Sequence, residues 1–161
     1  MINIYLKENL NKTLNENNIN VNDYLPAYNG ESAGLDLFNA GKTISIMPEA
    51  NKIDNSKTLI STGLCIAVPK GWVALLRERG SITKTPLKLR AGVIDSGYTG
   101  EIFVNLVNLG QNEFRIQQSE KLPVQLVVVK CDNEYNSVTY EEYNNLTNDV
   151  KRKSGMIGSS D

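Results

Sequence analysis

The residues best suited to chemistry lie close together between Arg90 and Asn108, in the stretch RAGVIDSGYTGEIFVNLVN. Asp95 offers a carboxylate that could accept a proton, and Tyr98 offers an aromatic face three residues later. Two apolar runs flank the polar segment Asp95–Gly100, a pattern that predicts a β-hairpin with Asp95 at its mouth. The glycines of the stretch would allow close backbone approach. This combination favours a ligand pocket. The alternative is that Asp95 stabilises a turn and Tyr98 covers a core edge.

The densest cationic segment, RERGSITKTPLKLR, runs from Arg77 to Arg90, directly before the hairpin. Within it, Arg79, Gly80 and Ser81 place a guanidinium, an accessible backbone and a hydroxyl side by side. These groups can together bind phosphate oxygens. A solvated charged face is the alternative interpretation of such a run.

Two polar residues stand inside apolar runs, and each needs a partner there. Asp36 lies in AGLDLFNA, from Ala33 to Ala40, and would be bonded to backbone amides, to an arginine or to a phosphate-bound metal. Gln125 lies in KLPVQLVV and is either a hydrogen-bonding residue at a strand edge or a ligand group.

Short strands at close spacing must position these residues. Strands are predicted over 2–6, 42–48, 59–68, 72–76, 112–118 and 122–131, which favours an all-β sandwich or barrel. The Asn-rich segment Lys7–Asp23 is predicted to be a surface insertion, and a short amphipathic piece is predicted near Tyr140–Leu146. The last residues, KRKSGMIGSSD, are small, basic and glycine-rich, which indicates a flexible tail.

Composition narrows the possible classes of protein. A chain of 161 residues is most simply one domain, and its net charge of −1 argues against a nucleic-acid or anionic-membrane binder. The sequence contains no histidine, so histidine zinc sites and Ser/His or Cys/His nucleophiles are excluded. Cys65 and Cys131 are predicted to be buried free thiols. With no apolar run long enough to span a membrane, these features predict a cytoplasmic protein, or an intracellular one in a host cell if it is viral.

The stretches AGVIDSGYTGEI and AGLDL resemble the third and first motifs of the trimeric dUTP diphosphatases, or dUTPases. The resemblance implies an all-β, jelly-roll-like β-barrel or sandwich. It also implies that Asp95 is the general base and that Tyr98 stacks on the deoxyribose. Asp36 would help to order the site and would reach Mg²⁺ through water. Uracil would be recognised by the backbone near Gly92, Ile94 and Phe103.

Three further stretches resemble the remaining dUTPase motifs. RERGS is similar to the second motif, which implies phosphate contacts from Arg79, Gly80 and Ser81, with Arg77 and Arg79 both open as the phosphate-binding arginine. KLPVQLVV is similar to the fourth, with Gln125 facing the phosphates. KRKSGMIGSSD resembles the fifth motif, a C-terminal arm (151–161) that follows the β domain (1–150) and closes over the nucleotide, with Ile157 where an aromatic residue usually stands. Its phosphate-binding residues would be Arg152, Gly158, Ser159 and Ser160.

The resemblance implies a homotrimer with shared active sites that uses Mg²⁺ to hydrolyse dUTP to dUMP and pyrophosphate. Water would attack the α-phosphorus, and the reaction would limit uracil incorporation into DNA and supply dUMP for dTMP synthesis. One alternative is a dCTP deaminase, which shares the fold but has a catalytic glutamate where Asn105 stands here. Another is a non-catalytic protein that responds to nucleotide and regulates a partner.

Overall fold

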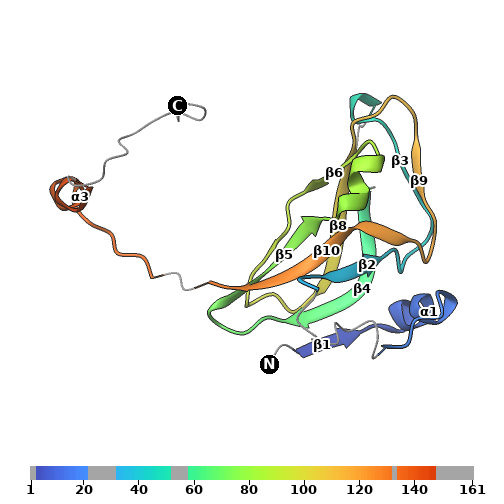
Figure 1. The fold of residues 1–161 in the computed structure, drawn as a ribbon, viewed down its shortest axis with the longest axis horizontal. Coiled ribbons are helices and arrows are strands. Elements are labelled where there is room, and N and C mark those ends of the chain that lie inside the picture. Colours follow the sequence, from blue (N-terminus) through green and yellow to red (C-terminus); the bar gives the residue numbers. More distant parts are fainter. Residues whose placement is uncertain (1–2, 22–31, 52–57, 132–133, 148–161) are drawn as a thin grey trace.

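The computed structural model describes residues 3–21, 32–51, 58–131 and 134–147. Most of the described residues outside the termini belong to β-strands (Figure 1). One four-stranded sheet has the order β1-β4-β8-β6, and all its neighbouring strands are antiparallel. Its strands are β1 (Asn3–Leu6), β4 (Leu59–Ala67), β6 (Leu87–Arg90) and β8 (Glu101–Asn108).

A second four-stranded antiparallel sheet has the order β2-β10-β5-β7. Its strands are β2 (Leu35–Phe38), β5 (Trp72–Glu78), β7 (Val93–Ile94) and β10 (Lys121–Lys130). A two-stranded sheet pairs β3 (Ile44–Ile46) with β9 (Phe114–Ile116). Two short 3₁₀ helices, η1 (Glu49–Asn51) and η3 (Gly80–Lys84), lie in the connections.

Both four-stranded sheets contribute to a single apolar core. Alternate residues of β8 and β10 are buried, as expected for strands with one face turned inward. The buried side chains include Ile102, Val104, Leu106, Leu122, Val124 and Leu126. Each fully buried aliphatic side chain contributes about 1.5–3 kcal/mol relative to exposure. The mostly β architecture confirms the sequence prediction, and the described strands form open sheets without a closed barrel.

The segment Lys7–Asp23 was wrongly predicted to be a surface insertion, because it contains the helix α1 (Glu8–Glu16). The side chains of Leu10 and Leu14 are 0% exposed. A Cβ on Gly63 would lie 2.6 Å from the Leu10 Cβ, so the helix packs tightly against β4. Burial of residues spaced like one face of a helix stabilises α1 despite its high asparagine content.

The predicted hairpin around Asp95–Gly100 is also wrong in its pairing. β7 pairs with β5, whereas β8 pairs with β4 and β6, so the two runs that flank the loop lie in different sheets. Ala91 and Gly92 adopt positive φ values of 61° and 133° and turn the chain from β6 toward β5. The Leu76 amide then donates a 2.7 Å hydrogen bond to the Gly92 carbonyl. The loop therefore connects the two sheets.

The C-terminal part of the described chain leaves β10 and ends in the helix α3 (Tyr140–Thr147), which lies away from the sheets in Figure 1. This helix confirms the amphipathic piece predicted near Tyr140–Leu146. Its apolar side chains are exposed: Tyr140 by 81%, Tyr143 by 57% and Leu146 by 72%. None of the described helices is long and apolar enough to cross a membrane.

Candidate active site

Three strands and the start of η3 bring a carboxylate and two cations together. Asp36 Oδ1 lies 2.7 Å from Arg79 Nε, and Asp36 Oδ2 lies 3.0 Å from Lys121 Nζ. β2 and β5 flank β10, which carries Lys121, and Arg79 directly follows β5. The predicted partner of Asp36 is therefore an arginine, as one alternative proposed, joined by a lysine that the sequence interpretation missed. We call Asp36, Arg79 and Lys121 the charge cluster.

Gln125 stands beside the charge cluster, opposite Asp36 in the pairing of β2 with β10. A Cβ on Gly34 would lie 2.6 Å from the Gln125 Oε1, so a larger residue there would displace the end of the Gln125 side chain. Lys121 lies four residues before Gln125 on the same strand. The period of two along a strand was therefore the signal that could have identified Lys121.

Arg79 is bonded to backbone carbonyls of β10, and the two residues that follow it are open to solvent. Its amide donates to the Pro123 carbonyl at 3.0 Å, and its Nη1 donates to the Leu122 carbonyl at 3.4 Å. Gly80 has no atom within 4 Å of an added Cβ, and Ser81 is exposed. Of the two candidate arginines, Arg79 is the one that pairs with Asp36. The Arg79–Gly80–Ser81 backbone and hydroxyl are accessible to a ligand.

The charge cluster does not provide a direct metal site. Both Asp36 oxygens already face cations, and the described residues contain no group of three or more Asp, Glu, Cys or His that could hold a metal. Mg²⁺ usually keeps several waters and is bound through few carboxylates together with substrate phosphates. The predicted contact of Asp36 with a phosphate-bound Mg²⁺ through water stays a prediction.

Asp95 and Tyr98 lie at the connection between β7 and β8. The Tyr98 amide donates to the Asp95 carbonyl at 3.0 Å and closes a turn, while the Asp95 side chain is exposed. The Tyr98 hydroxyl donates to the Glu101 carbonyl at 2.6 Å, and a Cβ on Gly100 would lie 2.8 Å from that hydroxyl. The glycine therefore lets the Tyr98 ring fold back over the backbone, where the residue remains 42% exposed.

A surface depression adjoins Asp95 at the end of β5. Its walls combine apolar side chains with two carboxylates and a thiol; they include Trp72, Val93, Asp95, Cys131 and Glu134. Cys65 and Cys131 are both free, as predicted, but are half-buried rather than buried. The depression gives Asp95 a partly apolar surrounding that is open to a ligand.

The residues predicted to recognise uracil flank the same connection along the chain. The Gly92 carbonyl is engaged by β5, Ile94 is half-buried on β7, and Phe103 on β8 is 43% exposed. The predicted phosphate-binding residues of the C-terminal arm lie outside the described residues; these are Arg152, Gly158, Ser159 and Ser160.

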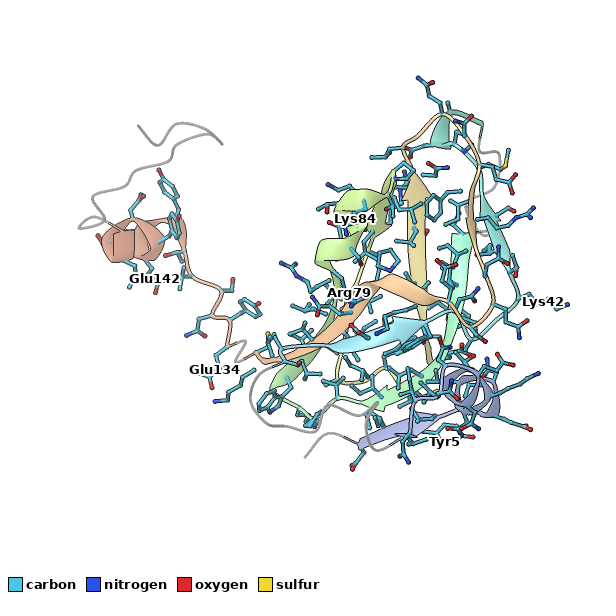
Figure 2. The ribbon with its side chains drawn as sticks, turned by 45° about the vertical axis from the view of Figure 1, so that its right-hand side comes forward. Tyr5, Lys42, Arg79, Lys84, Glu134 and Glu142 are labelled. Carbon is cyan, nitrogen blue, oxygen red and sulfur yellow. The ribbon has the colours of Figure 1, made fainter. Side chains whose placement is uncertain are left out.

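The charge cluster and Asp95 lie at opposite ends of β5. Ile94 pairs with Ala74, which places Asp95 beside Val73, whereas Arg79 follows the other end of the strand. The separation from position 73 to 79 corresponds to about 20 Å at ~3.3 Å per residue. In Figure 2, Arg79 lies within the body of the molecule, whereas Glu134, which lines the same depression as Asp95, lies at its margin. Within one chain, the charge cluster and Asp95 therefore lie in separate places.

Comparisons with known proteins agree with the motifs at this site. The dUTPase family model matches residues 21–161. Deoxyuridine 5'-triphosphate nucleotidohydrolases from Rickettsia felis and Rickettsia canadensis are 36% and 38% identical over 145 and 140 residues; the alignments cover 88% and 84% of this chain and 90% and 87% of those proteins.

Solved structures show the same fold. The dUTPase from phage phi11 of S. aureus matches with a TM-score of 0.65 and 22% identity, over 87% of this chain and 97% of that one. The dUTPase of Staphylococcus bacteriophage 80alpha matches with a TM-score of 0.64 and 21% identity, over 87% and 96%. The motif residues, the jelly-roll-like β fold and the curated relatives agree: this chain belongs to the dUTPase family, the enzymes that hydrolyse dUTP.

Proposed function

We propose that Asp95 is the general base of dUTP hydrolysis and that Tyr98 packs against the deoxyribose. Asp95 would accept a proton from a water whose oxygen forms a bond to the α-phosphorus, while the bond from that phosphorus to the bridging oxygen of the β-phosphate breaks. The products are dUMP and pyrophosphate. The exposure of Asp95 beside an apolar depression supports this role. A positioned general base typically contributes about 10²- to 10⁴-fold.

The charge cluster would bind the triphosphate. Arg79 and Lys121 together exceed Asp36 by one positive charge, and their side chains remain 27% and 45% exposed, so both are accessible to a phosphate. Arg79 and Ser81 would donate to phosphate oxygens, with the open backbone at Gly80 allowing close approach. Gln125 would face the same phosphates from β10. Mg²⁺ bound to the phosphates would neutralise charge that develops on the leaving pyrophosphate.

Recognition of the base and closure of the site complete the proposal. Backbone groups near Gly92, Ile94 and Phe103 would match the donor and acceptor pattern of uracil. The arm, residues 151–161, would follow a β domain of residues 1–150 and contribute Arg152, Gly158, Ser159 and Ser160 to the phosphates. Deleting the arm is expected to leave assembly intact and to reduce hydrolysis severely; full activity of the shortened chain would contradict its role.

The active enzyme is a homotrimer with sites shared between chains. The observation on which this depends is the separation of about 20 Å between Asp95 and Arg79 along β5, at ~3.3 Å per residue. A triphosphate is much shorter, and a general base must lie within hydrogen-bonding distance of its water. The Asp95 half of one chain must therefore meet the charge cluster of another.

Mixing two inactive variants tests this arrangement. Asp95→Asn and Arg79→Gln chains, each inactive alone, are unfolded together, refolded as an equal mixture and assayed. With one half of each site from each of two chains, about one quarter of the sites are intact. Activity near that fraction supports shared sites, whereas a mixture as inactive as its components contradicts them. The molar mass in solution checks the trimer.

Product analysis tests the reaction itself. Pyrophosphate and dUMP from dUTP are expected, whereas ammonia from dCTP would indicate a deaminase. The structure places Asn105 on β8 with its Oδ1 accepting a 2.7 Å hydrogen bond from the Thr58 hydroxyl, and the family comparisons do not favour deamination.

A further inference from the structure

We call the connection between β7 and β8, Asp95–Gly100, the Tyr98 loop; a nearly buried carboxylate stands where this loop enters β8. The side chain of Glu101 is only 10% exposed. Its Oε2 accepts a 2.8 Å hydrogen bond from the Lys7 ammonium. Its Oε1 accepts from the Ser61 hydroxyl at 2.5 Å and from the Gly63 amide at 2.9 Å. Glu101 thus joins the N-terminal segment to the irregular part of β4, where the register with β8 shifts.

This set of bonds keeps Glu101 charged within the protein. Burial alone would raise the pKa of Glu101, but the hydrogen bonds from Lys7, Ser61 and the Gly63 amide outweigh it and hold the pKa below its ordinary value. The same contact raises the pKa of Lys7. A nearly buried carboxylate with three hydrogen-bond donors is costly to move, so it restrains the backbone that carries it.

That backbone is the support of Tyr98. The Tyr98 hydroxyl donates to the carbonyl of Glu101 itself, and its ring lies over Gly100, where an added Cβ would approach the hydroxyl to 2.8 Å. The position of the ring therefore depends on where Glu101 is held. The Lys7 amide also donates to the Gly63 carbonyl at 2.8 Å, so Lys7 is attached to β4 independently of its side chain.

We infer that Glu101 is a positioning residue for Tyr98, and that Lys7, from the N-terminal segment, is part of the same support. The sugar-contacting loop is thereby held by a residue that precedes the stretch matched by the dUTPase family model, which begins at residue 21. The inference rests on the proposed role of Tyr98 in contacting deoxyribose. It assigns α1 and β1 a task beyond covering the core: they carry and orient the ammonium that holds the loop.

Removing the Lys7 ammonium tests this support while leaving Glu101, Ser61 and Gly63 in place. Lys7→Met is compared with Lys7→Arg, which keeps the charge. The matched control is Lys12→Met, which removes the same charge from the same segment, where Lys12 is 69% exposed and lies 3.9 Å from Glu16. The full-length enzyme is assayed for kcat and KM with dUTP and UTP, and hydrogen exchange is followed in the peptide that spans Asp95–Glu101.

Lys7→Met is expected to raise KM for dUTP and to narrow the dUTP-to-UTP ratio of kcat/KM by about 3- to 10-fold, because the lost bond is charge-assisted. Hydrogen exchange in the loop should accelerate in Lys7→Met. Lys7→Arg should keep the loop exchange and the nucleotide ratio of the unsubstituted enzyme. Lys12→Met should change neither of them. A lowered Tm with unchanged loop exchange and unchanged nucleotide ratio would overturn the inference, because Lys7 would then only stabilise the fold.

A further variant tests the proposed contact of Tyr98 with the sugar separately from the support by Lys7 and Glu101. If Tyr98→Ala leaves the nucleotide ratio unchanged, its proposed contact with the sugar fails. Loop exchange in Lys7→Met still decides the support inferred here: acceleration retains it, and unchanged exchange overturns it.

Discussion

The charge cluster and the support of the Tyr98 loop differ in the exposure of their charged side chains and in the number of hydrogen bonds that hold each carboxylate. In the charge cluster, Asp36, Arg79 and Lys121 meet across neighbouring strands and their side chains remain 27–45% exposed. In the loop, Glu101 is 10% exposed and accepts from three donors within the chain. Exposed ion pairs typically contribute only about 0–1 kcal/mol, whereas removing a partner from a buried charge costs considerably more.

This difference in exposure and hydrogen bonding suits the charge cluster to ligand binding and the Glu101 network to positioning the loop. Arg79 and Lys121 form partly exposed ion pairs with Asp36, so in the proposed function a triphosphate would replace these contacts at little cost to the fold. The donors around Glu101 all bond to its carboxylate, so they fix the local backbone rather than form a binding surface. Substitutions in the cluster should therefore act mainly on KM for dUTP, whereas substitutions around the loop should also change the selectivity between dUTP and UTP.

The largest expected effect falls on Asp95. Asp95→Asn should lower turnover by at least about 10²-fold while nucleotide binding is retained, because the amide keeps the shape but loses the proton-accepting oxygen. Steady-state kinetics and equilibrium binding of dUMP check this. Glu134→Gln, which alters the other carboxylate of the depression, is the control and should stay within about threefold. A greater loss in the control than in Asp95→Asn would make Glu134 the base.

Replacing Tyr98 should mainly change selectivity. Tyr98→Ala should narrow the dUTP-to-UTP ratio of kcat/KM by about tenfold or more, because space opens for a 2′-hydroxyl. Tyr98→Phe retains the ring but loses the bond to the Glu101 carbonyl that positions it, so it should narrow the ratio by about 3- to 10-fold, less than Tyr98→Ala. Competition kinetics with the two nucleotides measure both ratios, and an unchanged ratio in Tyr98→Ala would place selectivity elsewhere.

Removing one cation of the charge cluster should weaken binding moderately. Lys121→Met should raise KM for dUTP about 3- to 10-fold with little change in kcat, since Arg79 remains. Lys42→Met is the matched control, because Figure 2 shows Lys42 at the outer edge of the molecule, away from Arg79. Equal KM values for the two variants would remove Lys121 from the phosphate-binding region.

Motifs and strand periodicity predicted the β architecture, and they offered an arginine as one of several partners for Asp36 without identifying Arg79 or Lys121. α1 was missed because its asparagine content concealed the helical spacing of Leu10 and Leu14. The pairing of β7 with β5 depends on positive φ at Ala91, which residue type does not indicate. The contact between Lys7 and Glu101 joins residues 94 positions apart, so nothing in either neighbourhood predicts it.

The smallest expected effect is a pH-dependent change in stability that distinguishes the two regions. Because the folded pKa of Glu101 lies below its ordinary value of 4.5, its contribution is complete above that pH and is lost as pH falls through the folded pKa. The raised pKa of Lys7 keeps its part complete below 10.5, with loss only as pH rises through the folded value.

Glu101→Gln should therefore lower Tm by about 2–6 °C at every pH from 6 to 9, and this difference from the unsubstituted chain should close as pH falls below about 4. Thermal unfolding at a fixed protein concentration measures it, since assembly makes Tm concentration-dependent. Glu113→Gln breaks an exposed pair with Arg115, at 3.6 Å, and should leave Tm nearly unchanged across the range. If the two variants lost equal stability at neutral pH, the Glu101 network would stabilise the protein no more than a surface ion pair does. The contrast between a tightly bonded loop and an exposed charge cluster would then fail.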